Sequence, residues 1–213
     1  MKRARILCFC LLALLGACAA PKKVPTAPPE DLYRQAVKAI EKSDWAEAQR
    51  LLDHIRDESP FSNYAVEAEL LSADSLFKQE KWEEAAGAYK TFTELHPTHP
   101  KAAYAQYNRG LAYLKLAQKE DRDQTGTRNA AEAFQKLLNA YPASEFTEDA
   151  RKRLAQARET LASHELHVAR YYVRRKKYDA AVERIQVLLR NYPDAAVVPE
   201  AWKLVAELEA KKK

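Results

Sequence analysis

The chain has 213 residues, of which 47% are apolar and 31% are charged, with a formal net charge of +5 at pH 7. This composition excludes a disordered chain, and the length allows one domain or one elongated array. Only four glycines occur, and the segments between isolated prolines are rich in Ala, Leu, Glu, Lys, Arg and Gln, which all favour helices. Because strictly alternating runs of Val, Ile and Thr are absent from the sequence, it predicts an all-α fold.

Residues 1–17 have the pattern of a secretory signal peptide. The basic start Met1–Arg5 precedes the apolar run Ile6–Leu15, which is shorter than the roughly 20 residues of a membrane-spanning helix. Three of the 35 Lys and Arg residues lie in this segment, which leaves 32 against 30 Asp and Glu residues. This near balance disfavours a nucleic-acid partner, which usually requires a clustered excess of positive charge.

The four letters LGAC, at residues 15–18, resemble the lipobox of bacterial lipoproteins, in which the signal is cut before the cysteine and the cysteine carries lipid. Cys8 and Cys10 would leave with the signal peptide, so Cys18 would have no internal disulfide partner. Residue 19 is Ala and not the Asp that favours inner-membrane retention of such lipoproteins. The resemblance implies a lipid anchor in the outer membrane of a Gram-negative bacterium, facing the periplasm. The alternative is an ordinary signal peptide followed by a chance cysteine.

Behind the cysteine, residues 18–29 are rich in proline and have no helical period. We expect this stretch to form a semi-rigid tether between the lipid and the folded part. The helical part is expected to span residues 30–211.

A pattern of small, large and proline residues recurs four times in the helical part. An alanine stands twelve residues before each proline, larger apolar residues stand eight and five before it, and a small residue stands 24 before it in three units. In the third unit the small residue is Gly110, which an insertion displaces. Small residues let two antiparallel helices approach closely, and proline ends the second helix. The prolines are Pro60, Pro97, Pro142 and Pro193, and the alanines before them are Ala48, Ala85, Ala130 and Ala181.

This pattern resembles the tetratricopeptide repeat. It predicts a solenoid of about four helix pairs, at residues 30–60, 63–97, 100–142 and 145–193, with a capping helix at 197–211. The third pair has an insertion at Lys119–Gly126, and the fourth begins with a long helix at about Glu145–Arg175. The apolar side of the capping helix is expected to carry Val198, Trp202, Val205 and Leu208.

The sequence contains no catalytic constellation, so we expect no cofactor, no metal and no enzymatic activity. The two histidines of HELH, His164 and His167, are three residues apart and not four as in a zinc-binding HExxH, and a shared metal would need further ligands. Exposed helix positions are the alternative explanation. The basic run Val173–Lys177 is consistent with a helix C-terminus, where cations complement the dipole, or with an acidic partner or lipid head groups.

Several longer stretches resemble the BamD family, the lipoproteins of the outer-membrane β-barrel assembly machine. They are HPTHP and YNRGLAYL at 96–100 and 107–114, DRD before AAEAF, YPASEFTEDARKRL at 141–154, and VARYYVRRKKYDAAVERIQVLLRNYPD at 168–194. The resemblance covers nearly the whole mature chain and implies a non-enzymatic scaffold that helps insert β-barrel proteins into the outer membrane. The chain departs from the family at SPFSNY, where YPFGPY is usual, and in its shorter C-terminal region.

Seven residues on the first helices of the pairs are expected to line a groove, and an apolar lining of this kind marks a binding site. The resemblance implies that its ligand is an extended peptide with an aromatic end, from an unfolded outer-membrane protein. Residual packing in the core is the alternative. The residues are Tyr33, Val37, Leu70, Phe77, Tyr104, Tyr107 and Leu111.

The fourth unit is the most basic part of the chain. The BamD resemblance implies that this half docks onto a periplasmic domain of the central, BamA-like subunit. We expect Arg175 and Arg184 to make the contacts, because a guanidinium holds a carboxylate through two hydrogen bonds. Two other functions stay open: another lipidated adaptor, in pilus assembly or cell-division-linked envelope maintenance, and an envelope enzyme, which the missing constellation disfavours.

Overall fold

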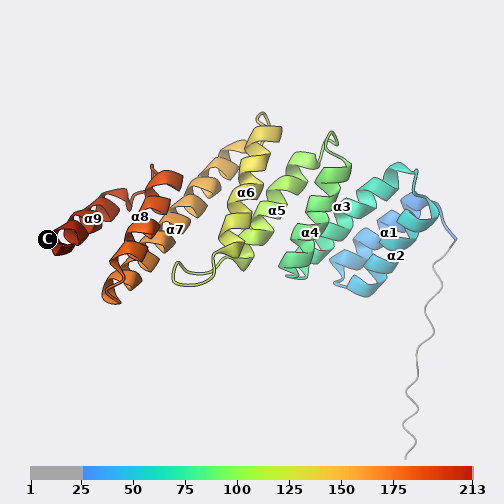
Figure 1. Ribbon diagram of the computed structural model, residues 1–213. Coiled ribbons are helices and arrows are strands. Elements are labelled where there is room, and N and C mark those ends of the chain that lie inside the picture. The colour runs from blue at the N-terminus through green and yellow to red at the C-terminus, as the bar shows by residue number, and fades with distance from the viewer. Residues whose placement is uncertain (1–25, 213) are drawn as a thin grey trace, which may run out of the picture.

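The computed structural model describes residues 26–212, and all regular structure within this range is α-helical. Figure 1 shows the helices side by side in chain order as an elongated array, with α1 and α9 at opposite ends. The predicted all-α solenoid of the tetratricopeptide type is therefore confirmed. The helices are α1 (Pro29–Glu41), α2 (Trp45–Glu58), α3 (Asn63–Lys78), α4 (Trp82–Leu95), α5 (Ala102–Leu116), α6 (Thr125–Ala140), α7 (Thr147–Arg174), α8 (Tyr178–Asn191) and α9 (Val198–Lys212).

Helices α1 to α8 form four antiparallel pairs, and each pair packs on the next along the chain. The small residues of the repeat pattern lie where the helices meet. Three of them, Ala36, Ala73 and Ala169, are completely buried. At Gly110 on α5, an added Cβ atom would lie only 2.5 Å from the ring of Phe134 on α6. The glycine therefore sets how closely the third pair can pack.

The turn inside three of the pairs has one residue with a positive φ angle, which ends the first helix and reverses the chain. The N–H of the residue that follows donates to the carbonyl five positions earlier, over 2.8 to 3.1 Å. None of the three residues is glycine, although an L residue is strained in this region. They are Ser43, Glu80 and Lys176, with φ of 58°, 61° and 58°.

The turns between pairs are made by the four repeat prolines. The residue that follows each second helix still donates its backbone N–H to a carbonyl of that helix, as Tyr141 does to the carbonyl of Leu137 over 2.8 Å. The next residue is proline, which has no N–H and cannot continue the helix. The repeat prolines thus separate one pair from the next.

Several boundaries differ from the expected ones. Helix α1 begins at Pro29, because proline is favourable in the first turn of a helix. The loop of the third pair spans residues 117–124, since α6 already begins at Thr125. Helix α7 begins at Thr147 and ends at Arg174, slightly inside the expected range.

Trp202 corrects the expectation for the last helix. It was placed on the packed side of α9, but its side chain is 57% exposed. Helix α9 packs on α8 through Ala201 and Leu208. Trp202 follows Ala201 directly, so it lies about 100° further round the helix and points away from α8.

The signal peptide (1–17), Cys18 and the tether as far as residue 25 lie outside the described residues. From residue 26 onward, none of the helices combines the length and the apolar character that crossing a bilayer demands.

Candidate functional site

Side chains on the first helices join one pair to the next along the array. Tyr33 on α1 contacts Tyr64 on α3, with ring centroids 5.7 Å apart. Lys101, at the start of α5, donates to the carboxylate of Glu67 on α3 over 2.7 Å. Helices α1, α3 and α5 are therefore joined along one face of the array.

Asp74 on α3 is a half-buried acceptor at the centre of this face. Its carboxylate accepts hydrogen bonds from the hydroxyl of Tyr89 on α4, over 2.6 Å, and of Tyr104 on α5, over 3.1 Å. Loss of solvation raises the pKa of Asp74, although the two hydroxyls partly oppose this. The same burial and the nearby carboxylate raise the pKa values of both tyrosines, which stay neutral donors.

Tyr107 on α5 holds the face to the fourth pair. Its ring stacks on Phe146, just before α7, with centroids 4.9 Å apart and planes at 22°. Its hydroxyl donates to Asp149, which also accepts from the guanidinium of Arg153. These two donors hold the pKa of Asp149 below its usual range. We call Tyr104, Tyr107, Phe146, Asp149 and Arg153 the tyrosine face.

The other expected groove residues lie at different depths. Leu70 is a correction: it is 2% exposed and belongs to the core of the second pair, so it cannot contact a ligand. Phe77 is half-buried, with its ring 4.9 Å from that of Trp82. Val37 and Leu111 are also half-buried, and Leu111 packs against the core between α5 and α6.

Apart from Leu70, the residues expected to line a groove are thus half-buried rather than exposed, and carboxylates hold the hydroxyls of Tyr104 and Tyr107. Asp74 was missed from the sequence. The sequence feature that could have revealed it is a carboxylate within an apolar helix. Its neighbours Ala73 and Ser75 are both buried, and a carboxylate in such a place needs hydrogen-bond donors. The tyrosines that supply these donors, Tyr89 and Tyr104, come from two other helices.

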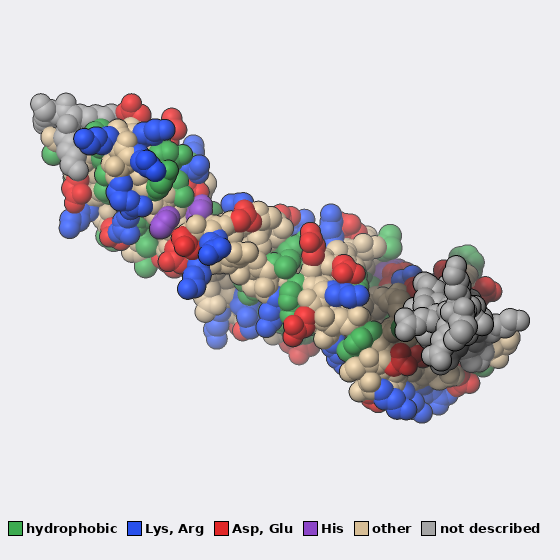
Figure 2. Space-filling view, turned by 90° about the horizontal axis from the view of Figure 1, so that it is seen from below, with side chains coloured by type: hydrophobic (Ala, Val, Ile, Leu, Met, Phe, Trp, Pro, Cys, Tyr) green, Lys and Arg blue, Asp and Glu red, His purple; other side chains and the backbone are tan. Residues whose placement is uncertain are grey.

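The two arginines proposed for docking both lie in the fourth pair. Arg184 on α8 forms an ion pair with Glu165 on α7 over 3.2 Å, and the two side chains are 43% and 15% exposed. Arg175 lies in the exposed turn, with its guanidinium 5.6 Å from the ring centre of Tyr171. Figure 2 shows Lys and Arg side chains gathered around the end formed by α7 to α9. Arg184 therefore already has an internal partner, whereas Arg175 faces solvent.

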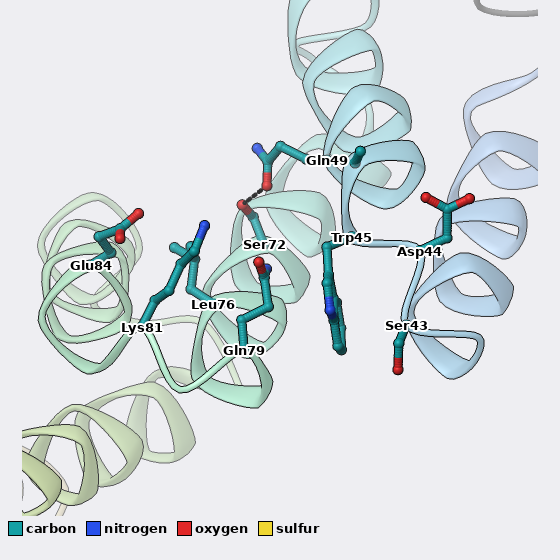
Figure 3. A pocket seen from close by; sticks show the side chains of 10 residues that line it. Ser43, Asp44, Trp45, Gln49, Ser72, Leu76, Gln79, Lys81 and Glu84 are labelled. Carbon is teal, nitrogen blue, oxygen red and sulfur yellow. Dashed lines mark hydrogen bonds between the residues drawn. The ribbon is translucent and has the colours of Figure 1, made fainter.

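A cleft of about 740 Å³ opens between the first and second pairs, on the side of α2 and α4 (Figure 3). Trp45 forms one wall, and Lys81 and Glu84 stand opposite it. Ser72 donates to Gln49 across the floor over 3.0 Å. The cleft is open and most of its lining residues are polar, and none of the residues expected to line a groove or to dock a partner lies in it.

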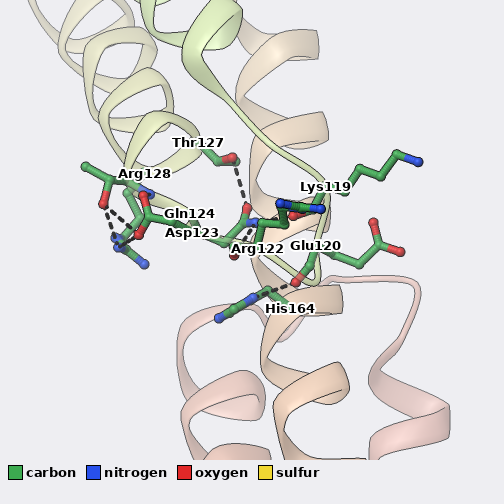
Figure 4. Close-up of polar contacts among 9 residues, drawn as sticks. Lys119, Glu120, Arg122, Asp123, Gln124, Thr127, Arg128 and His164 are labelled. Carbon is green, nitrogen blue, oxygen red and sulfur yellow. Dashed lines mark hydrogen bonds and ion pairs between the residues drawn. The ribbon is translucent and has the colours of Figure 1, made fainter.

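The insertion of the third pair folds against α7 (Figure 4). Buried Gln124 donates to the carbonyls of Lys119 and Arg122 over 2.7 and 3.0 Å, and it accepts from Thr127 over 3.0 Å. His164 Nδ1 lies 2.6 Å from the carbonyl oxygen of Glu120. The first histidine of HELH thus contacts this loop, and within residues 26–212 no cluster of His, Cys, Asp and Glu is arranged to hold a metal ion.

Comparison with known proteins assigns the chain to a family. The family model "YfiO: Outer membrane lipoprotein" matches residues 25–213. The outer membrane protein assembly factor BamD of Vibrio cholerae is 30% identical over 207 residues, which cover 92% of this chain and 86% of that protein. BamD of Neisseria meningitidis serogroup B is 33% identical, over 86% of this chain and 72% of that protein.

A solved structure of a tetratricopeptide repeat protein from Parabacteroides merdae is 16% identical, with a TM-score of 0.45 over 86% of this chain and 74% of that one. The family match spans every helix described above, together with the tyrosine face and the basic fourth pair. The chain belongs to the YfiO family of outer membrane lipoproteins, the family of the BamD assembly factors.

Proposed function

We propose that the chain is a lipid-anchored scaffold for the assembly of β-barrel proteins in the outer membrane, and that it acts by binding rather than by catalysis. Membership of its family supports a role in outer membrane protein assembly, because relatives that match most of this chain are outer membrane protein assembly factors. The tyrosine face supports the role of a scaffold. It is a preorganised surface of aromatic rings and paired charges on rigid helices.

The proposed ligand of this face is an extended peptide with an aromatic end from an unfolded barrel protein. Tyr104 and Tyr107 are half-buried, and their hydroxyls are held by carboxylates, so their rings are fixed before a peptide arrives. Fixed rings lose little conformational entropy on binding. Tyr33, which contacts Tyr64 on α3, is proposed to extend this surface toward the first pair.

Titration with such a peptide tests this surface. Tyr107→Ala and Phe77→Ala should weaken binding while the circular dichroism spectrum stays helical. Leu95→Ala is a matched control, because this exposed residue lies at the end of α4 and outside the face. Unchanged affinity for both face variants would exclude this binding site.

The second proposed contact is between the fourth pair and the periplasmic part of the central, BamA-like subunit. Arg175 offers an exposed guanidinium beside exposed Tyr171, and arginine and tyrosine are both enriched where interfaces are strong. Arg184 can contribute only if a partner carboxylate shares or replaces Glu165. We therefore expect Arg175→Glu to reduce capture of that subunit more than Arg184→Gln does.

A charge swap separates docking from folding at Arg184. Arg184→Glu alone places two carboxylates together and destabilises the fourth pair, whereas Arg184→Glu combined with Glu165→Arg restores an internal ion pair. If Arg184 docks, capture stays low in the double variant, although its melting temperature recovers. Full recovery of capture would show that Arg184 supports the fold and not the partner.

Cys18 is the proposed anchor. Cys18→Ser should release the chain from membranes or leave it with its signal, and the wild type should sediment with the outer membrane. Mass spectrometry of the N-terminal peptide and fractionation decide this. A Cys18→Ser variant that binds the membrane as tightly as the wild type, together with a wild-type peptide that carries no acyl mass, would refute the anchor.

A further inference from the structure

Arg109 on α5 is a buried charge without a counterion. Its side chain is 7% exposed, and no other Lys or Arg between residues 26 and 210 is buried. Its Nε atom lacks a hydrogen bond, and no described carboxylate forms an ion pair with it. The guanidinium lies beside the ring of Tyr113, with its central carbon 5.7 Å from the ring centre. A buried charge without a partner destabilises a fold, so a ligand outside the described residues is the expected compensation.

The helix pairs do not require an arginine at this position. Arg109 and Ser72 each stand twelve residues after a repeat proline, and Ser72 is also buried. The hydroxyl of Ser72 is satisfied, because it donates to Gln49 over 3.0 Å. In the fourth pair, the residue that directly precedes the small repeat residue is Val168, which is half-buried. The buried arginine is therefore a feature of the third pair and not of the repeat.

Arg109 lines a cleft of about 440 Å³ between the last turns of α4 and α6, which both pack on α5 (Figure 1). Glu94 from α4, together with Lys136 and Asn139 from α6, lines the same cleft. Arg109 stands two residues after Tyr107, about 200° further round the helix, so it points away from the tyrosine face. The test of this cleft is therefore independent of the proposed function.

The acidic residues around the cleft already have lysine partners. Glu94 forms an ion pair with Lys90 over 3.8 Å, and Glu132 forms one with Lys136 over 2.9 Å. Lys136, and to a smaller extent Arg109, hold the pKa of Glu132 below its usual range, but Glu132 forms no ion pair with Arg109. These three cations and two carboxylates leave one positive charge, which one negative charge on a ligand would neutralise.

We propose that this cleft binds a carboxylate of a peptide, from an Asp or Glu side chain or from a chain end, and that Arg109 holds it. The two terminal nitrogens of the guanidinium make no hydrogen bond with a described residue, and their fork matches the two oxygens of a carboxylate. The side-chain nitrogen of Asn139 is a second free donor, because only its oxygen is used, by Gln135. A doubly charged phosphate fits less well, since its second charge would meet Glu94.

Nuclear magnetic resonance of the isotope-labelled chain tests this site, because the shielded Nε–H of Arg109 exchanges slowly with water and serves as a reporter. Acetyl-Ala-Glu-Ala-amide presents a side-chain carboxylate, and acetyl-Ala-Ala-Ala with a free C-terminus presents a chain end. At least one of them should shift the signal saturably, and the tighter binder identifies the source. Acetyl-Ala-Ala-Ala-amide, which has no carboxylate, should not shift it. No shift with either acidic peptide would overturn the proposal, and so would tighter binding of inorganic phosphate.

Three variants, followed through the backbone signals of the cleft, separate the site from its surroundings. Arg109→Met keeps an apolar side chain of similar length and should weaken binding by about tenfold or more. Arg122→Met is the matched control, because it removes the same charge from an exposed loop outside the cleft, and it should bind like the wild type. Glu94→Gln, at an exposed site, should tighten binding at low salt by about twofold or more, because it removes a repelling charge.

Equal binding by Arg109→Met and the wild type would overturn the proposal. The carbonyls in the last turns of α4 and α6 would then be the compensation for the charge of Arg109. The Glu94→Gln result decides the matter if Arg109→Met does not fold, which its melting temperature shows. Unchanged or weaker binding by Glu94→Gln would contradict a carboxylate ligand in this cleft.

Discussion

The hydroxyl of Tyr107 on α5 donates a hydrogen bond to the carboxylate of Asp149 on α7, so that one contact joins the third helix pair to the fourth. The same ring stacks on Phe146, and its hydroxyl also accepts from Arg153 over 3.2 Å. In a solenoid, where each unit rests only on its neighbours, such a contact couples the proposed peptide surface to the basic half of the molecule.

Tyr107→Phe should keep the stacking and remove the hydrogen bonds. We expect the free energy of unfolding at pH 7 to fall by about 0.5–1.5 kcal/mol, toward the lower end because Asp149 is partly exposed. Urea unfolding measures this, with Tyr113→Phe as the control, since the Tyr113 hydroxyl makes no hydrogen bond with any described residue. Equal losses for both variants would contradict the account.

The effect of Tyr107→Phe should depend on pH. The pKa of Asp149 lies below its usual range in the folded chain, because Tyr107 and Arg153 donate to the carboxylate. The stability that this group contributes is therefore present above the ordinary pKa of aspartate and is lost as pH falls through the lowered value. The difference between wild type and Tyr107→Phe should shrink in acid, and a difference that stays constant would argue against this linkage.

The stability that Asp74 contributes should depend on pH in the opposite direction. Its pKa is raised by burial, so between the ordinary and the raised value the folded chain binds more protons than the unfolded chain. Stability then falls as pH rises through this window. Asp74→Asn cannot ionise, so its stability relative to wild type should increase as pH rises through the window. Urea unfolding of both proteins over the acid range measures the difference, and a flat difference would contradict the raised pKa.

Gly110→Ala and Gly87→Ala form a matched pair, because both sites lie inside helices without positive φ. At Gly110 the new methyl group meets the ring of Phe134, whereas nothing lies within 4 Å of the one at Gly87. Gly110→Ala should destabilise the chain by about 1–3 kcal/mol, and Gly87→Ala should stabilise it by up to about 1 kcal/mol. Thermal unfolding that shows the same sign for both would mean that α5 and α6 are not in close contact.

Glu80→Gly tests the strained turn of the second pair. Glycine adopts the φ of 61° without the steric cost that an L side chain meets. Glu80→Ala removes the same carboxylate but keeps the strain. Glu80→Gly should therefore be more stable than Glu80→Ala by about 1 kcal/mol in urea unfolding, and equal stabilities would show that this turn is unstrained.

The repeat pattern predicted the helix pairs because each of its residues affects only the helix that contains it and the adjacent helix. Proline ends a helix wherever it stands, and alanine or glycine permits a close crossing without reference to the rest of the chain. Gly110 shows this well, since its small size is explained by one ring on the next helix. The insertion before α6 was also found, although its boundary moved to 117–124.

The depth of individual side chains could not be predicted in the same way. Leu70 and Tyr107 each stand ten residues after a repeat proline. Leu70 is nevertheless buried in the core, whereas the longer side chain of Tyr107 reaches out of the core to Asp149. Trp202 follows the apolar period of α9, but no described helix covers it. Both outcomes depend on neighbours that the spacing along one helix does not specify.

Replacement of the chain in cells tests the central claim, a role in barrel assembly, most directly. Depletion should lower the amount of folded β-barrel protein in the outer membrane, measured by its heat-modifiable mobility on gels. Re-expression of the wild type should restore it, and a variant with Tyr107→Ala and Arg175→Glu should restore it only in part. Normal levels of folded barrel proteins after depletion, with loss of pilus secretins or division proteins instead, would contradict the account.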